Sequence, residues 1–168
     1  MTSSGNRALA VLATDERTQL EAFLDEYRQR ADDALDGLTE EQARRSLVPS
    51  RTTLLGLVKH LTFVERVWFG EVVTGTPRTA FGLPAASEDS FLLDDGDTVA
   101  SVLAAHRDAC AASRAAVAGR ALDDVLTGHR FGAMTLRWIH LHCLREFAQH
   151  AGHADILREQ VVTPNHLT

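Results

Sequence analysis

One pattern of helical spacing, at residues 135–162, limits the fold more than any other feature of this 168-residue chain. A series of positions there is separated by alternating steps of four and three residues, which places them on one face of an α-helix. They are Ile139, Cys143, Glu146, His150, His153 and Leu157. Apolar residues lie at both ends of this stripe, but a carboxylate and two imidazoles lie in its middle. Because burying such groups unpaired is costly, the stripe predicts a partner for them inside the protein.

Helical spacing also appears in three other long segments. The apolar residues recur three and four positions apart, as on the buried face of a helix, over residues 15–36, 52–73 and 98–118. A short helix is expected after Thr39, where Gln42 completes a capping box. Asp97 is expected to cap the helix over 98–118. Since no segment shows the strict alternation of a strand, the chain is predicted to be all-α.

The connection over residues 74–96 contains three glycines and two prolines and shows no clear period. A connection this long is uncommon in a compact domain, and in a four-helix bundle it suits a crossover between helices that are not antiparallel neighbours. The sequence therefore predicts a four-helix bundle with a long crossover between its second and third helices. We expect a single domain over 1–168, with residues 1–13 as a flexible N-terminus.

Composition narrows the classes of partner. The formal net charge is −6, which gives no basic face for nucleic acid. No run of about 18 apolar residues is present, so no membrane span is expected. The N-terminus lacks the basic start and apolar core of a signal peptide, which favours the cytoplasm. Two cysteines, Cys110 and Cys143, do not suggest a disulfide framework in such a chain.

A divalent metal ion would provide one partner for the polar part of the stripe. Glu146 and His150 are four residues apart, so one helix turn separates them and both can reach the same ion. His60 lies beside the apolar stripe of the helix over 52–73 and could supply a third ligand. Two histidines and a carboxylate leave positions open for water or substrate, and zinc, iron and nickel accept such a set. The alternatives are a surface ion pair for Glu146 and His150 and a hydrogen-bonded core residue for His60.

Other candidate residues are less sharply defined. His153 could be a proton carrier near the metal, a group that supports the ligands or a packing residue. Cys143 could join the site as a thiol, although a small buried core residue is the expected role. Phe81 and Phe91 of the 74–96 connection are expected to roof the substrate pocket. Four further histidines receive no role: His106 and His140 are expected at the surface, His129 in a loop and His166 in the tail.

Two segments carry a resemblance to a known family: SRTTLLGLVKHLTFVERVWF at 50–69 and TLRWIHLHCLREFAQHAGHADILRE at 135–159. They resemble the DinB-like superfamily of metal-dependent four-helix bundles, especially its actinobacterial single-domain branch, and GDTVASVLAAHRDAC fits as well. The resemblance implies a metal site at His60, Glu146 and His150. Many members use three histidines. The glutamate in the middle position is similar to the bundle domain of mycothiol-dependent maleylpyruvate isomerases.

This resemblance implies a function. The metal, zinc first with nickel or iron as alternatives, would activate a low-molecular-weight thiol similar to mycothiol for transfer to, or isomerisation of, an electrophilic small molecule. His153 would carry the proton, and the protein would be a homodimer. The maleylpyruvate isomerases have a further C-terminal domain that contributes to their site, so their own reaction is not expected here. The alternatives are a metal-dependent hydrolase and a non-catalytic stress-response or dimerisation bundle, in which Cys143 or His153 would close the metal site.

Overall fold

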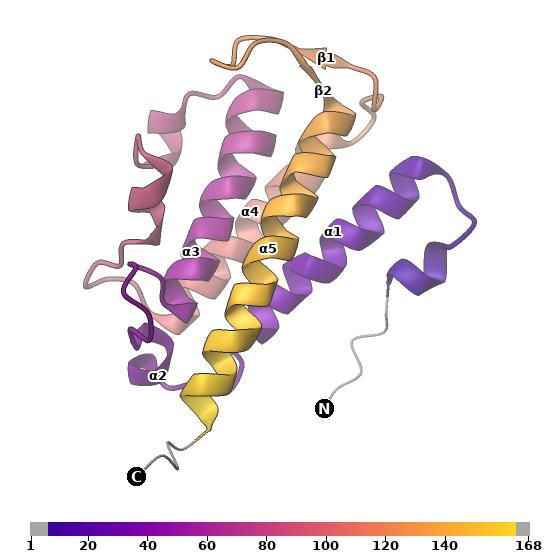
Figure 1. Cartoon of the computed structure of the whole chain (residues 1–168). Coiled ribbons are helices and arrows are strands. Elements are labelled where there is room, and N and C mark those ends of the chain that lie inside the picture. The colour runs from indigo at the N-terminus through magenta and orange to yellow at the C-terminus, as the bar shows by residue number, and fades with distance from the viewer. Residues whose placement is uncertain (1–6, 164–168) are drawn as a thin grey trace.

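The computed structural model describes residues 7–163 and forms a bundle of four long helices (Figure 1). These are α1 (Glu16–Asp33), α3 (Leu54–Glu65), α4 (Val99–Val117) and α5 (Leu136–Val162). Helix α1 packs against α5, and α3 packs against both α4 and α5. The predicted all-α four-helix bundle is therefore confirmed. No helix within residues 7–163 is long and apolar enough to cross a membrane.

The direction of the helices confirms the predicted crossover. In Figure 1, α1 and α5 run downward while α3 and α4 run upward, so the connection between α3 and α4 joins two parallel helices. We call residues 74–96 the crossover segment. It contains two short 3-10 helices, η3 (Arg78–Phe81) and η4 (Ser87–Phe91), and η4 packs against α3. The segment is thus more ordered than its irregular sequence suggested, because each short helix needs only one or two local hydrogen bonds.

Threonine and aspartate side chains start the main helices. Thr39 and Gln42 form the predicted capping box at α2 (Glu40–Arg44). The expectation that Asp97 caps α4 is wrong, since Thr98 and Ser101 make a capping box there. The Asp97 carboxylate instead accepts a hydrogen bond of 2.6 Å from Lys59 Nζ on α3. Asp97 therefore ties the end of the crossover segment to α3.

Helix α3 does not keep one geometry to its end. From Arg66 to Val72 the chain continues as a π-helical turn, η2, which was expected to be ordinary α-helix. Gly70 in this turn lies against Phe81, and a Cβ at that glycine would be only 2.9 Å from the Phe81 ring. The glycine thus lets the crossover segment approach the upper part of the α3–η2 helix closely.

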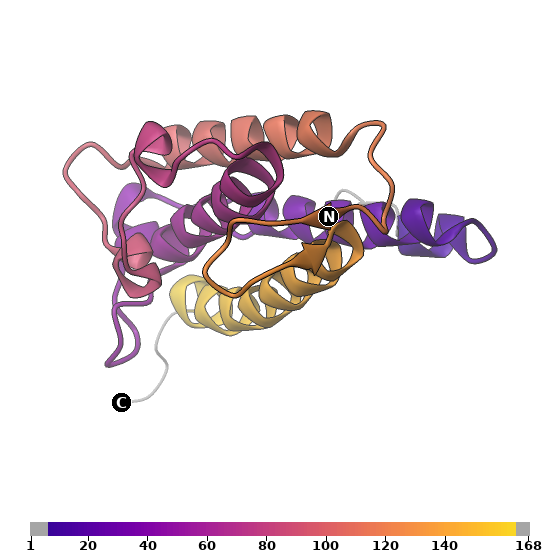
Figure 2. The same ribbon diagram turned by 90° about the horizontal axis from the view of Figure 1, so that it is seen from above.

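A short hairpin precedes α5. Strand β1 (Val125–Leu126) pairs antiparallel with β2 (Met134–Thr135), although no strand was expected. Strands of two residues are too short to produce a visible alternation in the sequence. Figure 2 shows this hairpin lying across the ends of the helices at the top of the bundle.

The first residues described form the 3-10 helix η1 (Ala8–Val11), which contacts α1. Of the expected flexible N-terminus, residues 1–6 lie outside the described part of the chain. The same holds for His166 and for Pro164, which was expected to end the last helix; α5 ends at Val162.

Two histidines expected at the surface are buried. The exposed fractions of His106 and His140 are 1% and 2%. His106 Nδ1 lies 2.9 Å from an Asp32 carboxylate oxygen, and His140 Nδ1 lies 3.0 Å from the Leu136 carbonyl oxygen. Because each imidazole finds a polar partner inside the bundle, its burial is tolerated. Ile156 of α5, in contrast, is exposed.

Candidate metal centre

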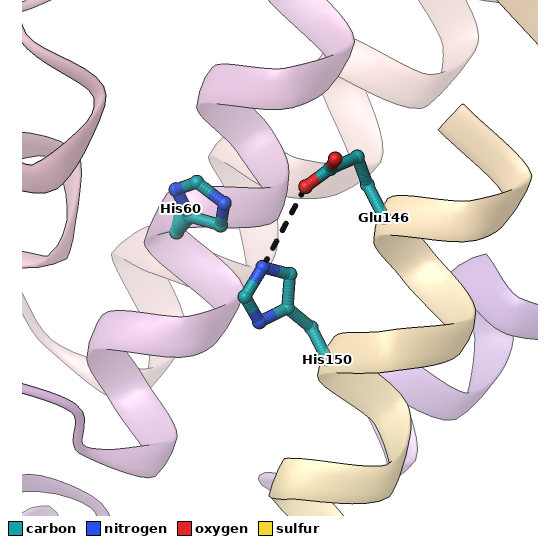
Figure 3. Close-up of side chains that lie close together, drawn as sticks. All are labelled: His60, Glu146 and His150. Atoms are coloured by element: carbon teal, nitrogen blue, oxygen red, sulfur yellow. Dashed lines mark ion pairs between the residues drawn. The ribbon is translucent and has the colours of Figure 1, made fainter. Parts of the chain in front are cut away.

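The structure brings His60, Glu146 and His150 together between α3 and α5 (Figure 3). Each of the three offers one ligand atom, and these atoms all lie within 4.8 Å of one another. Glu146 Oε2 is 3.8 Å from His150 Nε2, and the His60 and His150 rings meet edge to face with centroids 4.7 Å apart. Within residues 7–163, no other group of three histidine, cysteine or acidic side chains has this arrangement. These three residues, called the triad below, are positioned to bind a metal ion.

The way α5 packs explains why polar side chains occupy this place. The helix contacts both α1 and α3, so its buried arc is wider than a single stripe. The centre of that arc is apolar, with Cys143, Phe147 and Ala154 all buried. Glu146 and His150 lie at its margin on the side of α3, where they are only partly covered. The predicted stripe is therefore the edge of the packed surface, where polar ligands can be held without replacing the core.

His60 is oriented by the crossover segment. Its Nδ1 lies 2.7 Å from Ser90 Oγ on η4, and Ser90 Oγ lies 2.5 Å from the Ser87 carbonyl oxygen. A hydroxyl has one proton, and a carbonyl can only accept. Ser90 therefore donates to Ser87 and accepts from Nδ1–H of His60. This leaves the lone pair on Nε2, the nitrogen that faces Glu146 and His150 in Figure 3.

Phe91 of the crossover segment covers the same imidazole. Its ring stacks on His60 with centroids 4.0 Å apart and planes 12° from parallel. Gly56 makes this approach possible, because a Cβ there would be 2.7 Å from the Phe91 carbonyl oxygen. Phe81 does not reach the triad. It borders two cavities of about 520 and 470 Å³ between α3 and α4, neither of which is lined by a triad residue.

The electrostatics of the site suit a cation. Burial, assisted by the nearby His150, lowers the pKa of His60 to about 3. Burial also lowers the pKa of His150, although the Glu146 charge opposes this. Both imidazoles are therefore neutral near pH 7 and retain lone pairs for a metal. His150 Nδ1 is buried without a hydrogen-bond partner, so protein groups do not fully satisfy the cluster by themselves. The residues present fit a divalent ion.

Two candidates on α5 lie outside the triad. Cys143 is completely buried, and burial raises the pKa of its thiol well above the ordinary value. It is a core residue that stays protonated. His153 is exposed, and its ring meets that of His150 edge to face with centroids 5.5 Å apart. Neither belongs to the group of potential ligands.

One neighbour of the triad was not foreseen. His142 Nε2 lies 3.8 Å from Glu146 Oε1, one turn before it on α5. Glu146 is thus flanked by imidazoles on both sides, and Arg145 donates a hydrogen bond of 3.1 Å to it as well. The spacing of four residues between His142 and Glu146 is a signal in the sequence that could have identified this contact.

Comparison with known families agrees with this geometry. Residues 19–162 match the family model described as mycothiol-S-transferase. A search of curated proteins found no matching sequence. Because the family match covers most of the chain, the resemblance stated from the two motifs is confirmed, and the protein belongs to the mycothiol-S-transferase family, within the DinB-like superfamily of metal-binding bundles.

Proposed function

We propose that this protein transfers mycothiol, a low-molecular-weight thiol, to an electrophilic small molecule at a divalent metal held by His60, Glu146 and His150. Membership of the mycothiol-S-transferase family implies transferase activity, a thiol cosubstrate and an electrophile. The single observation that supports the metal site is that three potential ligand atoms lie within 4.8 Å of one another. Zinc is the preferred ion, since two imidazoles and a carboxylate are ordinary zinc ligands in sites that keep an open position, and nickel or iron would accept the same set.

Each residue of the site has a defined task in this proposal. A bound divalent ion would favour the thiolate form of the cosubstrate, which is the nucleophilic form. His60 presents Nε2 because Ser90 engages its other nitrogen, while α5 presents Glu146 and His150 from one face. The described residues provide no fourth ligand, so the site is suited to catalysis more than to a structural metal.

The proton of the thiol also needs an acceptor. In the transfer, the S–H bond breaks and a new S–C bond forms to the electrophile, whose leaving group departs with the bonding electron pair. We assign the proton to His153, which lies beside His150 at the exposed edge of the site and can pass the proton to water. A His153→Gln variant should keep its metal and lose roughly a hundredfold in turnover. Unchanged turnover would remove His153 from the mechanism.

The cellular setting follows from the thiol. We propose that the protein acts in the cytoplasm, because the cosubstrate implied by the family is a cytosolic thiol. We also propose a homodimer, since several large apolar side chains of the described residues are exposed, Leu141 and Ile156 of α5 among them. Light scattering on the purified protein tests the dimer, and a monomer at all concentrations would exclude it.

Metal analysis of protein purified without an affinity tag is the decisive experiment. We expect near-stoichiometric metal in the wild type and loss of metal in His60→Ala, Glu146→Ala and His150→Ala. Gln149→Ala, an exposed neighbour on the same helix, is the matched control and should keep its metal. Loaded protein should then consume an electrophile only when mycothiol is present.

Two results would contradict the proposed function. Folded wild type that contains no metal and binds no zinc, nickel or iron on reloading would remove the metal site. Loaded protein that hydrolyses esters in the absence of any thiol would replace the transferase with the hydrolase.

A further inference from the structure

Both tryptophans of the chain, Trp68 and Trp138, lie in one group of aromatic side chains at the top of the bundle. Their ring centroids are 5.5 Å apart, although one residue comes from η2 and the other from α5. His142 stacks nearly parallel on Trp138, with centroids 5.0 Å apart and planes at 5°, and its centroid is 4.2 Å from that of Trp68. His129 of the hairpin loop contacts Trp68 at 5.1 Å. We call Trp68, His129, Trp138 and His142 the aromatic cluster.

The aromatic cluster is continuous with the triad. His142 is the link, since its Nε2 atom lies 3.8 Å from Glu146 Oε1 while its ring stacks on Trp138. One imidazole therefore separates the exposed indole from the Glu146 carboxylate. The aromatic cluster therefore adjoins the triad through His142.

The two flanks of the triad differ in access. On the flank of the crossover segment, Phe91 stacks directly on His60 and Ser90 is buried, so that flank is closed. On the other flank, Trp138 is 43% exposed and Phe131 of the hairpin loop is 65% exposed. Glu146, which faces this flank, has the most exposed side chain of the triad at 22%. On this flank the exposed aromatic side chains are therefore Trp138 of the cluster and Phe131 beside His129.

We propose that the aromatic cluster is the binding subsite for the electrophile and that it selects planar aromatic molecules. This proposal rests on the proposed transferase function, which requires an electrophile next to the triad. Stacked or edge-to-face aromatic pairs attract each other beyond simple area burial, and the partly exposed Trp138 indole can make such a pair with a planar ligand. A small aliphatic electrophile would reach the triad without using these faces. The cluster therefore decides which electrophile binds well and leaves the thiol chemistry unchanged.

Binding can be tested without metal or thiol. The probe is 1,3-dinitrobenzene, a planar aromatic molecule without a leaving group, titrated into the metal-free protein by calorimetry. Trp138→Leu removes the exposed indole and keeps an apolar side chain; it should weaken binding roughly two- to tenfold, the size of one aromatic contact. Val162→Ala is the matched control, because Val162 is a half-exposed apolar residue of α5 outside the cluster. It should bind the probe as the wild type does.

Kinetics on the loaded enzyme give a second readout. With 1-chloro-2,4-dinitrobenzene, Trp138→Leu should raise KM by a similar factor with little change in kcat. With iodoacetamide, a small aliphatic electrophile, neither constant should change. Equal effects on both electrophiles would overturn the proposal, since they would show a general structural loss.

The outcomes separate this proposal from the proposed function. Probe binding that Trp138→Leu weakens, in a protein without transferase activity, supports the aromatic site and contradicts the transferase. Transferase activity with no preference for aromatic electrophiles supports the transferase and contradicts the aromatic site. A dimer that dissociates in Trp138→Leu, together with no binding of 1,3-dinitrobenzene, would overturn the subsite and make the cluster an interface between copies of the chain.

Discussion

Arg28 on α1 holds the carboxylate of Glu65 on α3 through two hydrogen bonds of 2.7 and 2.8 Å. Both side chains are buried. Arg28 also donates to Asp25, whose carboxylate accepts hydrogen bonds from Arg114 on α4. These charges therefore connect three helices, and Glu65 is the residue at which α3 passes into its π-helical turn. The network holds α3, which carries His60, in a fixed position relative to the rest of the fold.

Breaking this pair is expected to be severely destabilising. Glu65→Gln keeps the shape of the side chain and removes its charge, which leaves the Arg28 guanidinium buried without its counter-ion. A loss of about 3–5 kcal/mol in the free energy of unfolding is expected, measured by urea denaturation. The control is Asp155→Asn, which removes the exposed ion pair with Arg30 and should cost about 0–1 kcal/mol. Similar losses in the two variants would contradict the role given to the network.

The hydrogen bond from His60 to Ser90 should influence metal affinity. Ser90→Ala removes the acceptor that keeps the proton on Nδ1, so we expect metal to bind roughly 10–100-fold more weakly in a competition assay with a chelating dye. Ser87→Ala is the matched control, because the Ser87 contact to Ser90 uses the backbone carbonyl and survives the substitution. Nitrogen-15 NMR of metal-free wild type tests the premise directly. A proton on Nε2 of His60 would refute it.

Gly56 is expected to control how closely η4 approaches α3. A Cβ at Gly56 would be 2.7 Å from the Phe91 carbonyl oxygen, so Gly56→Ala must push η4 away and move Phe91 off His60. We expect a loss of about 1–3 kcal/mol in stability together with weaker metal binding. Gly152→Ala on α5 meets no atom within 4 Å and should stabilise the helix by about 0.5–1 kcal/mol. Thermal unfolding and metal titration of both variants provide the measurement. Unimpaired metal binding by Gly56→Ala would show that η4 does not position His60.

Acid should destabilise the metal-free protein before its carboxylates titrate. In the unfolded chain, histidines gain protons near pH 6.5. In the folded protein, burial lowers the pKa of His60 to about 3 and also lowers the pKa of His150. The unfolded state therefore binds more protons as the pH falls, and the stability present above pH 6.5 is lost progressively toward pH 3. Between pH 6.5 and 3, His60 contributes a slope of about 1.4 kcal/mol per pH unit, and His150 adds to the loss in the same direction.

Chemical denaturation of metal-free protein between pH 7 and 4 measures this slope. His60→Gln, which cannot titrate, should show a shallower decline than the wild type by about the contribution of one histidine. Parallel curves for the two proteins would mean that His60 is protonated in the folded state as readily as in the unfolded chain.

Local features of the chain could be predicted with success. The helix over 135–162 was predicted almost residue for residue, because its apolar spacing and Thr135 cap are contained in consecutive residues. The pairing of Glu146 with His150 is also local, since a helix places residues four apart on one face. Periodicity alone did not connect His60 with Glu146 and His150. The family resemblance supplied the reason to place the three residues in one site.

Features that depend on packing could not be predicted in the same way. His106 and His140 were expected at the surface because no nearby sequence shows a partner; Asp32, which meets His106, lies 74 residues away along the chain. Arg28 and Glu65 are separated by 37 residues and belong to different helices. Ser90 lies in a segment without a regular pattern, so neither its helix nor its contact with His60 leaves a periodic signal.

Consecutive residues were enough to predict the four long helices, the capping box at Thr39, the crossover and the pairing of Glu146 with His150, because these features depend on hydrogen bonds and spacings within a few residues. Only the tertiary structure shows that His60 faces these two residues, that Ser90 and Phe91 contact its ring, and that Trp68 and Trp138 meet. Those contacts join segments distant in the chain. They form only when burial of apolar surface brings α3, α5 and the crossover segment together, so the rotation of each helix in the bundle decides which side chains meet.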